Sequence, residues 1–224
     1  MISIEHTQTY CWPAAIRGAR NPMNSWHLSD SFQSVDYENV MGGYVVGPKD
    51  LDLMKRLSNA GPDHGKFLRM ITVTMDVSAP LYWWKEFDTY KVGTTANSCS
   101  TMHKIHAKEF SMDDFSCEHL FDTDTSEPCT HVYMFRQNLQ NTIDALNMAR
   151  LKYLDTKDKK FWWQMIQNLP TTYNQKRTIH LNYAVLKNMY HARKAHKLDE
   201  WHTFCDWIST LPYAKELIIG EVSE

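Results

Sequence analysis

The sequence lacks any long apolar segment and any secretion signal. No run of about 18 apolar residues occurs, and the first residues, MISIEHTQTYCW, contain no charged region followed by an apolar one. The 5 cysteines are an odd number at scattered positions, which is unlike a disulfide framework. We therefore expect a cytoplasmic protein in a reducing compartment, with no membrane partner.

The signatures of several common enzyme classes are also missing. The sequence has no GxGxxG, GxxxxGKS/T, GxSxG or HExxH motif, which excludes the usual phosphate-binding loops, serine hydrolase elbows and zinc protease helices. The formal net charge of −2 gives no broad basic surface. Because nucleic-acid binding depends on such a surface, we do not expect nucleic acid as a partner.

Two thiol–imidazole pairs, Cys117-x-His119 and Cys129-x-His131, lie in the acidic stretch 113–130. Zinc sites normally use CxxC and HxxxH spacings, which are absent here. We interpret the stretch as a loop and predict no metal site.

Hydrophobic and aromatic residues, in contrast, are plentiful. With 43% hydrophobic, 12% aromatic and 22% charged residues, the composition is that of a folded globular protein. No linker rich in proline, glycine or serine interrupts the chain, and it has no internal repeat. We therefore predict one domain over residues 1–224.

Hydrophobic periodicity places strands mainly in the first half of the chain and helices in the second. Alternating apolar residues predict a strand over Phe67–Val77, with weaker strand signals over 1–10 and 40–46. Helical spacing predicts helices over 49–60, from 137 to 160 and on to 169, from within 171–176 to about 196, and from about 198 to before 211. In the longest of these helices the apolar side consists of Leu139, Ile143, Leu146 and Met148.

The stretch Ala79–His103 combines aromatic residues with polar ones. It follows the clearest strand, carries Trp83 and Trp84, and then becomes a small polar run, Asn97–Ser100. Binding groups tend to lie on loops that packed elements hold in place, so we interpret this run as a ligand-facing turn. No recognisable motif places a general base beside Ser100, so we predict no catalytic nucleophile. We expect the two tryptophans to lie in the core or at a subunit interface.

A second polar group, made of Arg17, Arg20 and Asn21, surrounds Gly18. Two arginines near a glycine can hold a phosphate or a carboxylate by charge-assisted hydrogen bonds. Ordinary surface arginines in a solvated loop or at a helix end explain the pattern equally well. Both interpretations stay open.

Two segments resemble the flavin-dependent thymidylate synthases, the ThyX family. The first is the strand ending in VSAP, the aromatic-rich helix after it and the run Asn97–Ser100; the family has a strand, a helix and the signature RHRxxSxNExSxRY in this region. The second is Leu169-Pro170 followed by Asn182 and Arg193, at the separations found in the family. The resemblance covers roughly residues 67–208.

The resemblance implies an α+β fold with an antiparallel sheet and long helices, and a homotetramer with sites at subunit interfaces. It implies FAD as cofactor, with NADPH and methylene-tetrahydrofolate as co-substrates in the methylation of dUMP. On this basis we predict that a pyrimidine nucleotide is bound by Lys91, Asn97, Ser98, Ser100 and Arg193. The residues that we predict near the cofactor are Arg17, Arg20, Asn21, His64, Tyr90 and Asn182.

The sequence departs from the family signature at several charged positions. The tripeptide RHR corresponds to Tyr90-Lys91-Val92, or to Thr89-Tyr90-Lys91 if the register moves by one, so at most one cation remains. The glutamate of the signature corresponds to Ser98, its last arginine to Met102 and its tyrosine to His103. Each lost charge-assisted hydrogen bond removes about 1.5–3 kcal/mol of binding free energy unless another cation replaces it.

The sequence is therefore compatible with three functions. The first is a divergent flavin-dependent thymidylate synthase, and the second is an inactive relative that sequesters or senses a nucleotide. The third is a structural or interaction protein, which would leave the polar run Asn97–Ser100 without a purpose. Divergence of this kind is also compatible with a phage gene.

Overall fold

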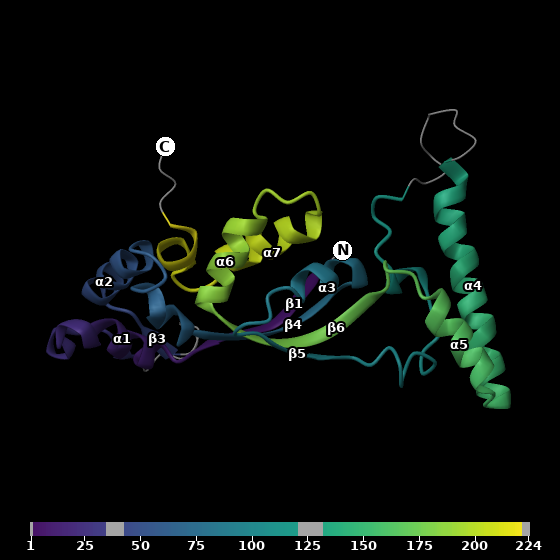
Figure 1. Cartoon of the computed structure of the whole chain (residues 1–224), viewed down its shortest axis with the longest axis horizontal. Coiled ribbons are helices and arrows are strands. Elements are labelled where there is room, and N and C mark those ends of the chain that lie inside the picture. Colours follow the sequence, from purple (N-terminus) through teal and green to yellow (C-terminus); the bar gives the residue numbers. More distant parts are fainter. Residues whose placement is uncertain (1, 35–42, 121–131, 221–224) are drawn as a thin grey trace. The chain divides into compact units, whose positions relative to one another are not determined.

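The computed structural model describes residues 2–34, 43–120 and 132–220 (Figure 1). The chain groups into two compact units, each assembled from segments that are distant in sequence. Unit 1 contains Ser78–Glu86 and Ser98–Arg177, and unit 2 contains Ile2–Val77, Phe87–Asn97 and Thr178–Glu224. The single domain over 1–224 stays a prediction.

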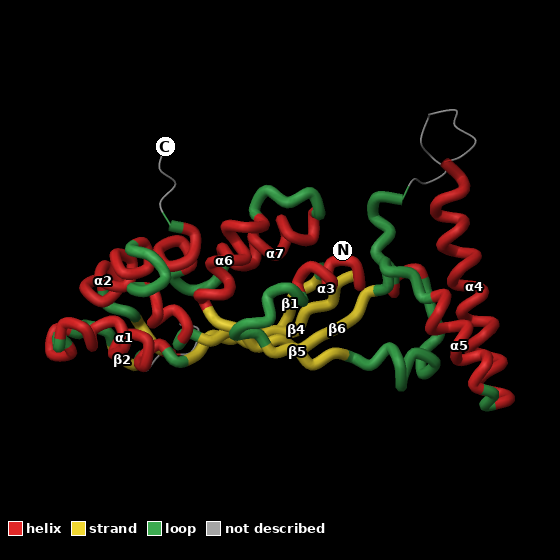
Figure 2. Tube along the Cα trace, viewed as in Figure 1, coloured by secondary structure: helices red, strands yellow, loops and turns green. Residues whose placement is uncertain are grey.

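The main sheet has four strands in the order β1, β4, β6, β5 (Figure 2). They span Ser3–Tyr10 (β1), Thr72–Pro80 (β4), Asn174–Asn182 (β6) and Thr95–Ser98 (β5). A separate antiparallel pair joins β2 (Phe32–Gln33) to β3 (Tyr44–Val45). The predicted α+β class with an antiparallel sheet and long helices is confirmed.

Strand β4 shows the alternation on which its prediction rested. Val73, Met75 and Val77 are buried, while the residues between them are partly exposed. The predicted start at Phe67 was wrong, because Gly65–Arg69 forms a 3₁₀ helix and β4 begins at Thr72. Phe67 is buried from within that helical turn, and its apolar character alone did not distinguish the two conformations.

Seven α-helices occur in the described residues. They are α1 (Trp12–Arg20), α2 (Pro48–Asn59), α3 (Leu81–Phe87), α4 (Val132–Thr156), α5 (Lys159–Asn168), α6 (Tyr183–Arg193) and α7 (Asp199–Ser209). The positions of α2 and α7 agree with the predicted helices. The single helix predicted from 137 to 169 is instead two helices: Lys157 has a φ of 56°, and Asp158 caps α5 by accepting a hydrogen bond from the Lys160 amide at 3.0 Å.

The helix predicted from within 171–176 to about 196 was wrong in its first half. Residues Asn174–Asn182 form β6, and α6 begins only at Tyr183. Ile179 and Leu181 are buried while His180 between them is exposed, which is the alternation of a strand. Ile179 also fits a helical repeat with Leu186, so the helical period was extended too far towards the N-terminus.

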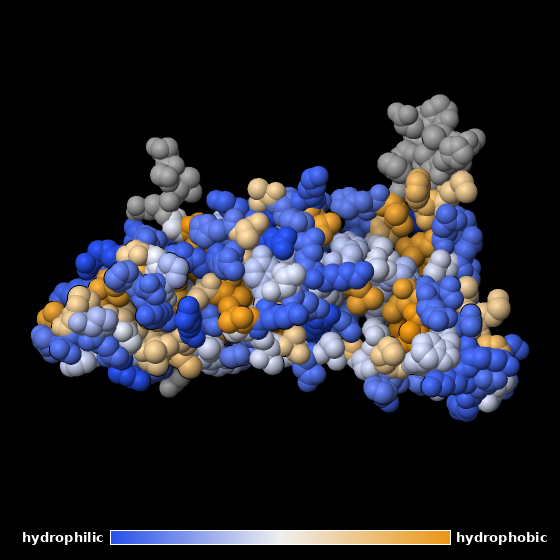
Figure 3. All heavy atoms as spheres, viewed as in Figure 1, coloured by the Kyte–Doolittle hydropathy of each residue, from blue (hydrophilic) through white to orange (hydrophobic). Residues whose placement is uncertain are grey.

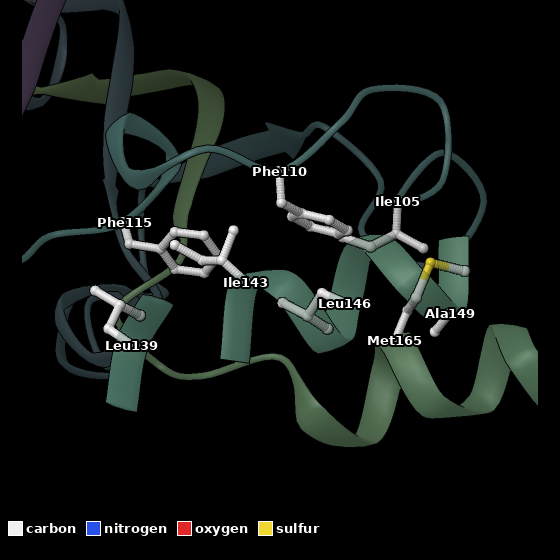
Figure 4. Close-up of a cluster of buried hydrophobic side chains, with 8 residues drawn as sticks. All are labelled: Ile105, Phe110, Phe115, Leu139, Ile143, Leu146, Ala149 and Met165. Carbon is white, nitrogen blue, oxygen red and sulfur yellow. The ribbon is translucent and has the colours of Figure 1, made fainter. Parts of the chain in front are cut away.

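Unit 1 has a core between α4, α5 and the loops that precede α4 (Figure 4). Its buried side chains are Ile105, Phe110, Phe115, Leu139, Ile143, Leu146, Ala149 and Met165. The predicted apolar side of α4 is thus confirmed except at Met148, which is 66% exposed. Met148 lies two residues beyond Leu146, about 200° further around the helix, and therefore faces away from the core.

Hydrophilic residues cover most of the face drawn in Figure 3, with hydrophobic ones in small groups. Within the parts of the chain that the structure describes, no helix has the length and apolar character needed to cross a membrane. Trp83 and Trp84 are fully buried in unit 1, which confirms that they are core residues.

Unit 2 contains a buried ion pair between Arg20 at the end of α1 and Asp50 in the first turn of α2. The Arg20 Nε donates to Asp50 Oδ1, and both side chains are at most 5% exposed. The other carboxylate oxygen accepts hydrogen bonds from the hydroxyls of Ser29 and Ser31, each at 2.6 Å, and from the backbone amides of Asp30 and Ser31. The ion pair therefore fixes the loop between α1 and α2.

The environment of Asp50 lowers the pKa of its carboxyl group. Burial by itself would raise that pKa, but the hydrogen bonds from Ser29, Ser31 and Arg20 outweigh the burial. Because the folded pKa lies below the unfolded value of about 3.9, the ionised carboxylate stabilises the fold above that pH. This stabilisation is lost as the pH falls through the folded pKa.

We predict that Asp50→Asn destabilises the protein by about 3–5 kcal/mol, because it leaves the buried Arg20 cation without its anion. The measurement is the free energy of unfolding from denaturant titration. The control is Asp52→Asn, which breaks an exposed pair with Arg56 on the same helix and should cost less than about 1 kcal/mol. Equal losses in the two variants would contradict the structural role of Asp50.

The lowered pKa of Asp50 also predicts that the free energy of unfolding of the wild-type protein falls on acidification below about pH 4.

Candidate functional site

Unit 2 contains a pocket of about 460 Å³ at the N-terminal end of α6. One wall is the segment Thr89–Gly93, which follows α3, and the opposite wall is formed by Asn182 and the first residues of α6. Arg69, at the end of the 3₁₀ helix, completes the lining. Ligand pockets in proteins typically measure about 300–1,000 Å³, so this one is large enough for a small organic molecule.

Three predicted site residues meet in this pocket: Tyr90, Lys91 and Asn182. They come from two segments about 90 positions apart in sequence, and the fold brings them to the same cavity. Lys91 is exposed, whereas Tyr90 and Asn182 are half-buried. The pocket therefore combines a cation, a phenol and an amide.

Asn182 has a structural function as well as a place in the pocket. It is the N-cap of α6, and its side-chain oxygen accepts a hydrogen bond from the Val185 amide at 3.1 Å. The side-chain nitrogen makes no hydrogen bond to the residues that the structure describes. The cap thus fixes the orientation of the amide and leaves its donor side available to a ligand.

Gly93 lies directly opposite this amide nitrogen. A Cβ atom at Gly93 would lie 2.9 Å from Asn182 Nδ2 and 3.3 Å from Val185 Cγ2, and the φ of 78° is one that other residues rarely adopt. Both the contact and the backbone conformation favour glycine here. Its missing side chain keeps the space beside the Asn182 amide open.

Arg193 supports the pocket without lining it. Its Nε donates to the Tyr90 hydroxyl at 2.9 Å, and its guanidinium carbon lies 4.9 Å from the centre of the Trp201 ring and 5.6 Å from that of Tyr90. These contacts combine a hydrogen bond with two cation–π interactions. They hold the Tyr90 side chain in place, and the predicted contact of Arg193 with a nucleotide stays a prediction.

The predicted arginine cluster does not meet this pocket. Arg20 is buried, and its donors are occupied by Asp50, the Ser25 carbonyl and the Leu28 carbonyl. Arg17 is exposed on α1, so the cluster is a helix end rather than a loop. The exposed side chain of Asn21 accepts a hydrogen bond from the Trp26 indole at 2.7 Å.

The remaining predicted residues are exposed and lie elsewhere. His64 is exposed just before the 3₁₀ helix, and Asn97 is exposed in β5. Ser98 and Ser100 belong to unit 1, where Ser100 Oγ accepts a hydrogen bond from the His103 amide at 2.9 Å. The run expected to be a turn is a strand up to Ser98, which corrects that prediction.

Arg69, Gly93 and Asn188 are among the lining residues that were not predicted from the sequence. Ala184 and Asn188 are one helical turn apart and face the pocket together, a pattern that required the start of α6 to be placed correctly. Arg69 carried no signal beyond its charge. No cluster of possible metal ligands occurs among the described residues, and Cys129 and His131 lie outside them.

Comparisons with known proteins give a match in structure but not in sequence. No protein-family model matches this sequence, and no curated protein matches it. Thymidylate synthase X (ThyX) from Helicobacter pylori, solved with FAD and dUMP, superposes with a TM-score of 0.67 at 15% identity, covering 97% of each chain. The UMP/dUMP methylase PolB from Streptomyces cacaoi, solved with 5-Br UMP, has a TM-score of 0.60 at 13% identity and covers 94% of this chain and 88% of its own. At these identities the likeness shows the fold, and the predicted ThyX-like fold is confirmed.

Proposed function

We propose that this chain is a divergent ThyX-like protein that binds FAD and a pyrimidine nucleotide related to dUMP. The observation that carries the proposal is the convergence of Tyr90, Lys91 and Asn182 in one pocket. The resemblance to the ThyX family assigns Tyr90 and Asn182 to the cofactor and Lys91 to the nucleotide. The H. pylori and S. cacaoi structures, which have the same fold, contain FAD and dUMP in one case and 5-Br UMP in the other.

The residues of the pocket fit a flavin cofactor. Lys91 and Arg69 supply positive charge for phosphate groups, and no carboxylate of the described part of the chain lines the pocket to oppose them. The amides of Asn182 and Asn188 supply hydrogen-bond donors and acceptors, while Gly93 permits close approach of a ligand to the backbone. The chemistry of the donors therefore agrees with a phosphorylated ring system.

In this proposal the protein binds and orients, and FAD supplies the redox chemistry when it is bound. Asn182 donates from its capped and therefore fixed amide, and Arg193 keeps the Tyr90 wall in place. Lys91 partly replaces the cations of the family's RHR tripeptide. We further propose that Asn97, Ser98, Ser100 and Arg193 contact the pyrimidine nucleotide, and that NADPH and methylene-tetrahydrofolate serve as co-substrates in a homotetramer.

An inactive nucleotide-binding protein is the second candidate. One observation favours it. Tyr90 stands where the family's RHR tripeptide has its first arginine or, in the other register, its histidine, and the Tyr90 hydroxyl accepts a hydrogen bond from Arg193. Arg193 is thereby tied to the wall of the pocket. A site with a retained pocket and a reduced number of cations is suited to sequestering or sensing a nucleotide.

The native protein should show the visible absorption bands of oxidised flavin, either as purified or after incubation with FAD and gel filtration. Release by heat and mass analysis should then identify FAD. A flavin-loaded protein that methylates dUMP supports the enzyme, and one that binds FAD and dUMP without turnover supports the inactive relative. The proposal is contradicted if the protein fraction shows no flavin absorbance after incubation with excess FAD and gel filtration.

Gly93→Ala should weaken FAD binding by tenfold or more, because its Cβ occupies the space beside Asn182 Nδ2. The matched control is Gly220→Ala, at a φ of 77° with its nearest neighbour at an ordinary 3.8 Å. Both variants pay a similar backbone cost of about 1–2 kcal/mol, seen in thermal unfolding. Equal FAD affinities in the two folded variants would place the ligand elsewhere.

A further inference from the structure

Unit 2 contains a second pocket, of about 510 Å³, that adjoins the first. It lies between the end of α2, the 3₁₀ helix Gly65–Arg69 and the middle of α6. Arg69, Ala184 and Asn188 line both pockets, so the two cavities share one wall. The function proposed above uses Arg69 and Asn188 of the shared wall, and none of the residues that line the second cavity alone.

The lining of the second pocket is positively charged. Arg69, Lys187 and the imidazole of His191 face it, and neither aspartate nor glutamate lines it among the residues that the structure describes. Arg69 makes no ion pair and no side-chain hydrogen bond within the described parts of the chain. Nearby Lys66, by comparison, pairs with Asp63 at 3.9 Å. Within residues 2–34, 43–120 and 132–220, no acidic side chain thus neutralises the charge of Arg69.

Lys187 is the half-buried member of this group. Its Nζ donates to the Ser58 carbonyl at 2.8 Å and to the Ser58 hydroxyl at 2.7 Å, and that hydroxyl donates to the Leu217 carbonyl at 2.8 Å. Both acceptors are neutral, and the ammonium group has a third N–H. Burial lowers the pKa of Lys187, and no carboxylate among the described residues compensates for it.

The contact of Lys187 with the C-terminal end of α2 explains why this lysine lies where it does. Cations near the last carbonyls of a helix are favourable, and Ser58 lies in the last turn of α2. That contact does not explain why Arg69 and His191 face the same cavity. His191 is held in position by its Nε2, 3.0 Å from the Ile218 carbonyl.

We propose that the second pocket binds the phosphate group of a small molecule through Lys187 and Arg69, with His191 at its edge. Two cationic side chains, with an imidazole beside them and no acid among the described lining residues, suit a multiply charged phosphate better than a single carboxylate. The proposal does not require flavin in the first pocket. The phosphate belongs either to a free inorganic diphosphate or to a nucleoside diphosphate whose ring system reaches the adjoining cavity.

The test is calorimetric titration of the full chain with pyrophosphate and, separately, with ADP, at constant ionic strength. Wild-type protein should bind at least one of them saturably at one site per chain. Lys187→Met and Arg69→Met should each weaken binding by about tenfold or more, as expected for the loss of a charge-assisted hydrogen bond. The control Lys66→Met removes a nearby charge outside the pocket and should leave the affinity unchanged.

The outcomes separate the two sources of phosphate. Tighter binding of ADP than of pyrophosphate supports a nucleotide, and equal affinities support the phosphate alone. Absence of saturable binding, or equal weakening in all three variants, overturns the proposal. Should Lys187→Met fail to fold because it loses its contact with α2, Arg69→Met decides, since Arg69 is exposed. Pyrophosphate binding in a protein that takes up no FAD would refute the proposed flavin function and leave this site standing.

Discussion

The hydrogen bond from the Val185 amide to the Asn182 side chain is the interaction on which the candidate site depends. It fixes the residue at which β6 ends and α6 begins. The next residue, Tyr183, is buried and tied at both ends: its amide donates to the Ile71 carbonyl and its hydroxyl to the Pro212 carbonyl. Because this junction is rigid, the amide nitrogen of Asn182 has a defined direction, and Gly93 leaves room in front of it.

Unit 2 contains a buried carboxylate, Asp50, and a half-buried ammonium group, Lys187, which differ in their hydrogen-bond partners. The Asp50 carboxylate accepts hydrogen bonds from one arginine, two hydroxyls and two backbone amides, so its negative charge is compensated within the protein. Among the residues that the structure describes, the Lys187 ammonium donates only to the carbonyl and the hydroxyl of Ser58. A charge removed from water is costly unless an opposite charge accompanies it. Asp50 therefore has a structural role, whereas Lys187 has an incomplete set of partners and faces a cavity.

The sequence predicted the fold class well and the site in part. The spacing of Leu169-Pro170, Asn182 and Arg193 led to the ThyX-like fold, and the same resemblance led to Tyr90, Lys91 and Asn182. Local periodicity failed at β6, because Ile179 and Leu181 are compatible with a strand and Ile179 also with the helix that follows. The central place of that strand in the sheet, which is a property of the tertiary structure, decided between them.

The sequence likewise does not show which arginines are buried and which face a pocket. Arg17 and Arg20 look equivalent in the sequence, yet one is exposed and the other is buried against Asp50, 30 positions further along. Arg69, which lines two pockets, stands in no motif at all. Whether a cation stabilises the fold or faces a ligand depends on distant partners, and a single sequence does not contain those distances.

The most direct test of the central claim is the affinity for FAD of wild-type protein and of Asn182→Asp, measured by fluorescence titration. Aspartate is as good an N-cap as asparagine, so thermal stability should stay the same. The replacement changes the amide donor that the α6 cap holds towards the cavity into an anion, and FAD affinity should fall by tenfold or more. Unchanged FAD affinity in a stable Asn182→Asp protein, or no FAD binding by the wild type, would contradict the account.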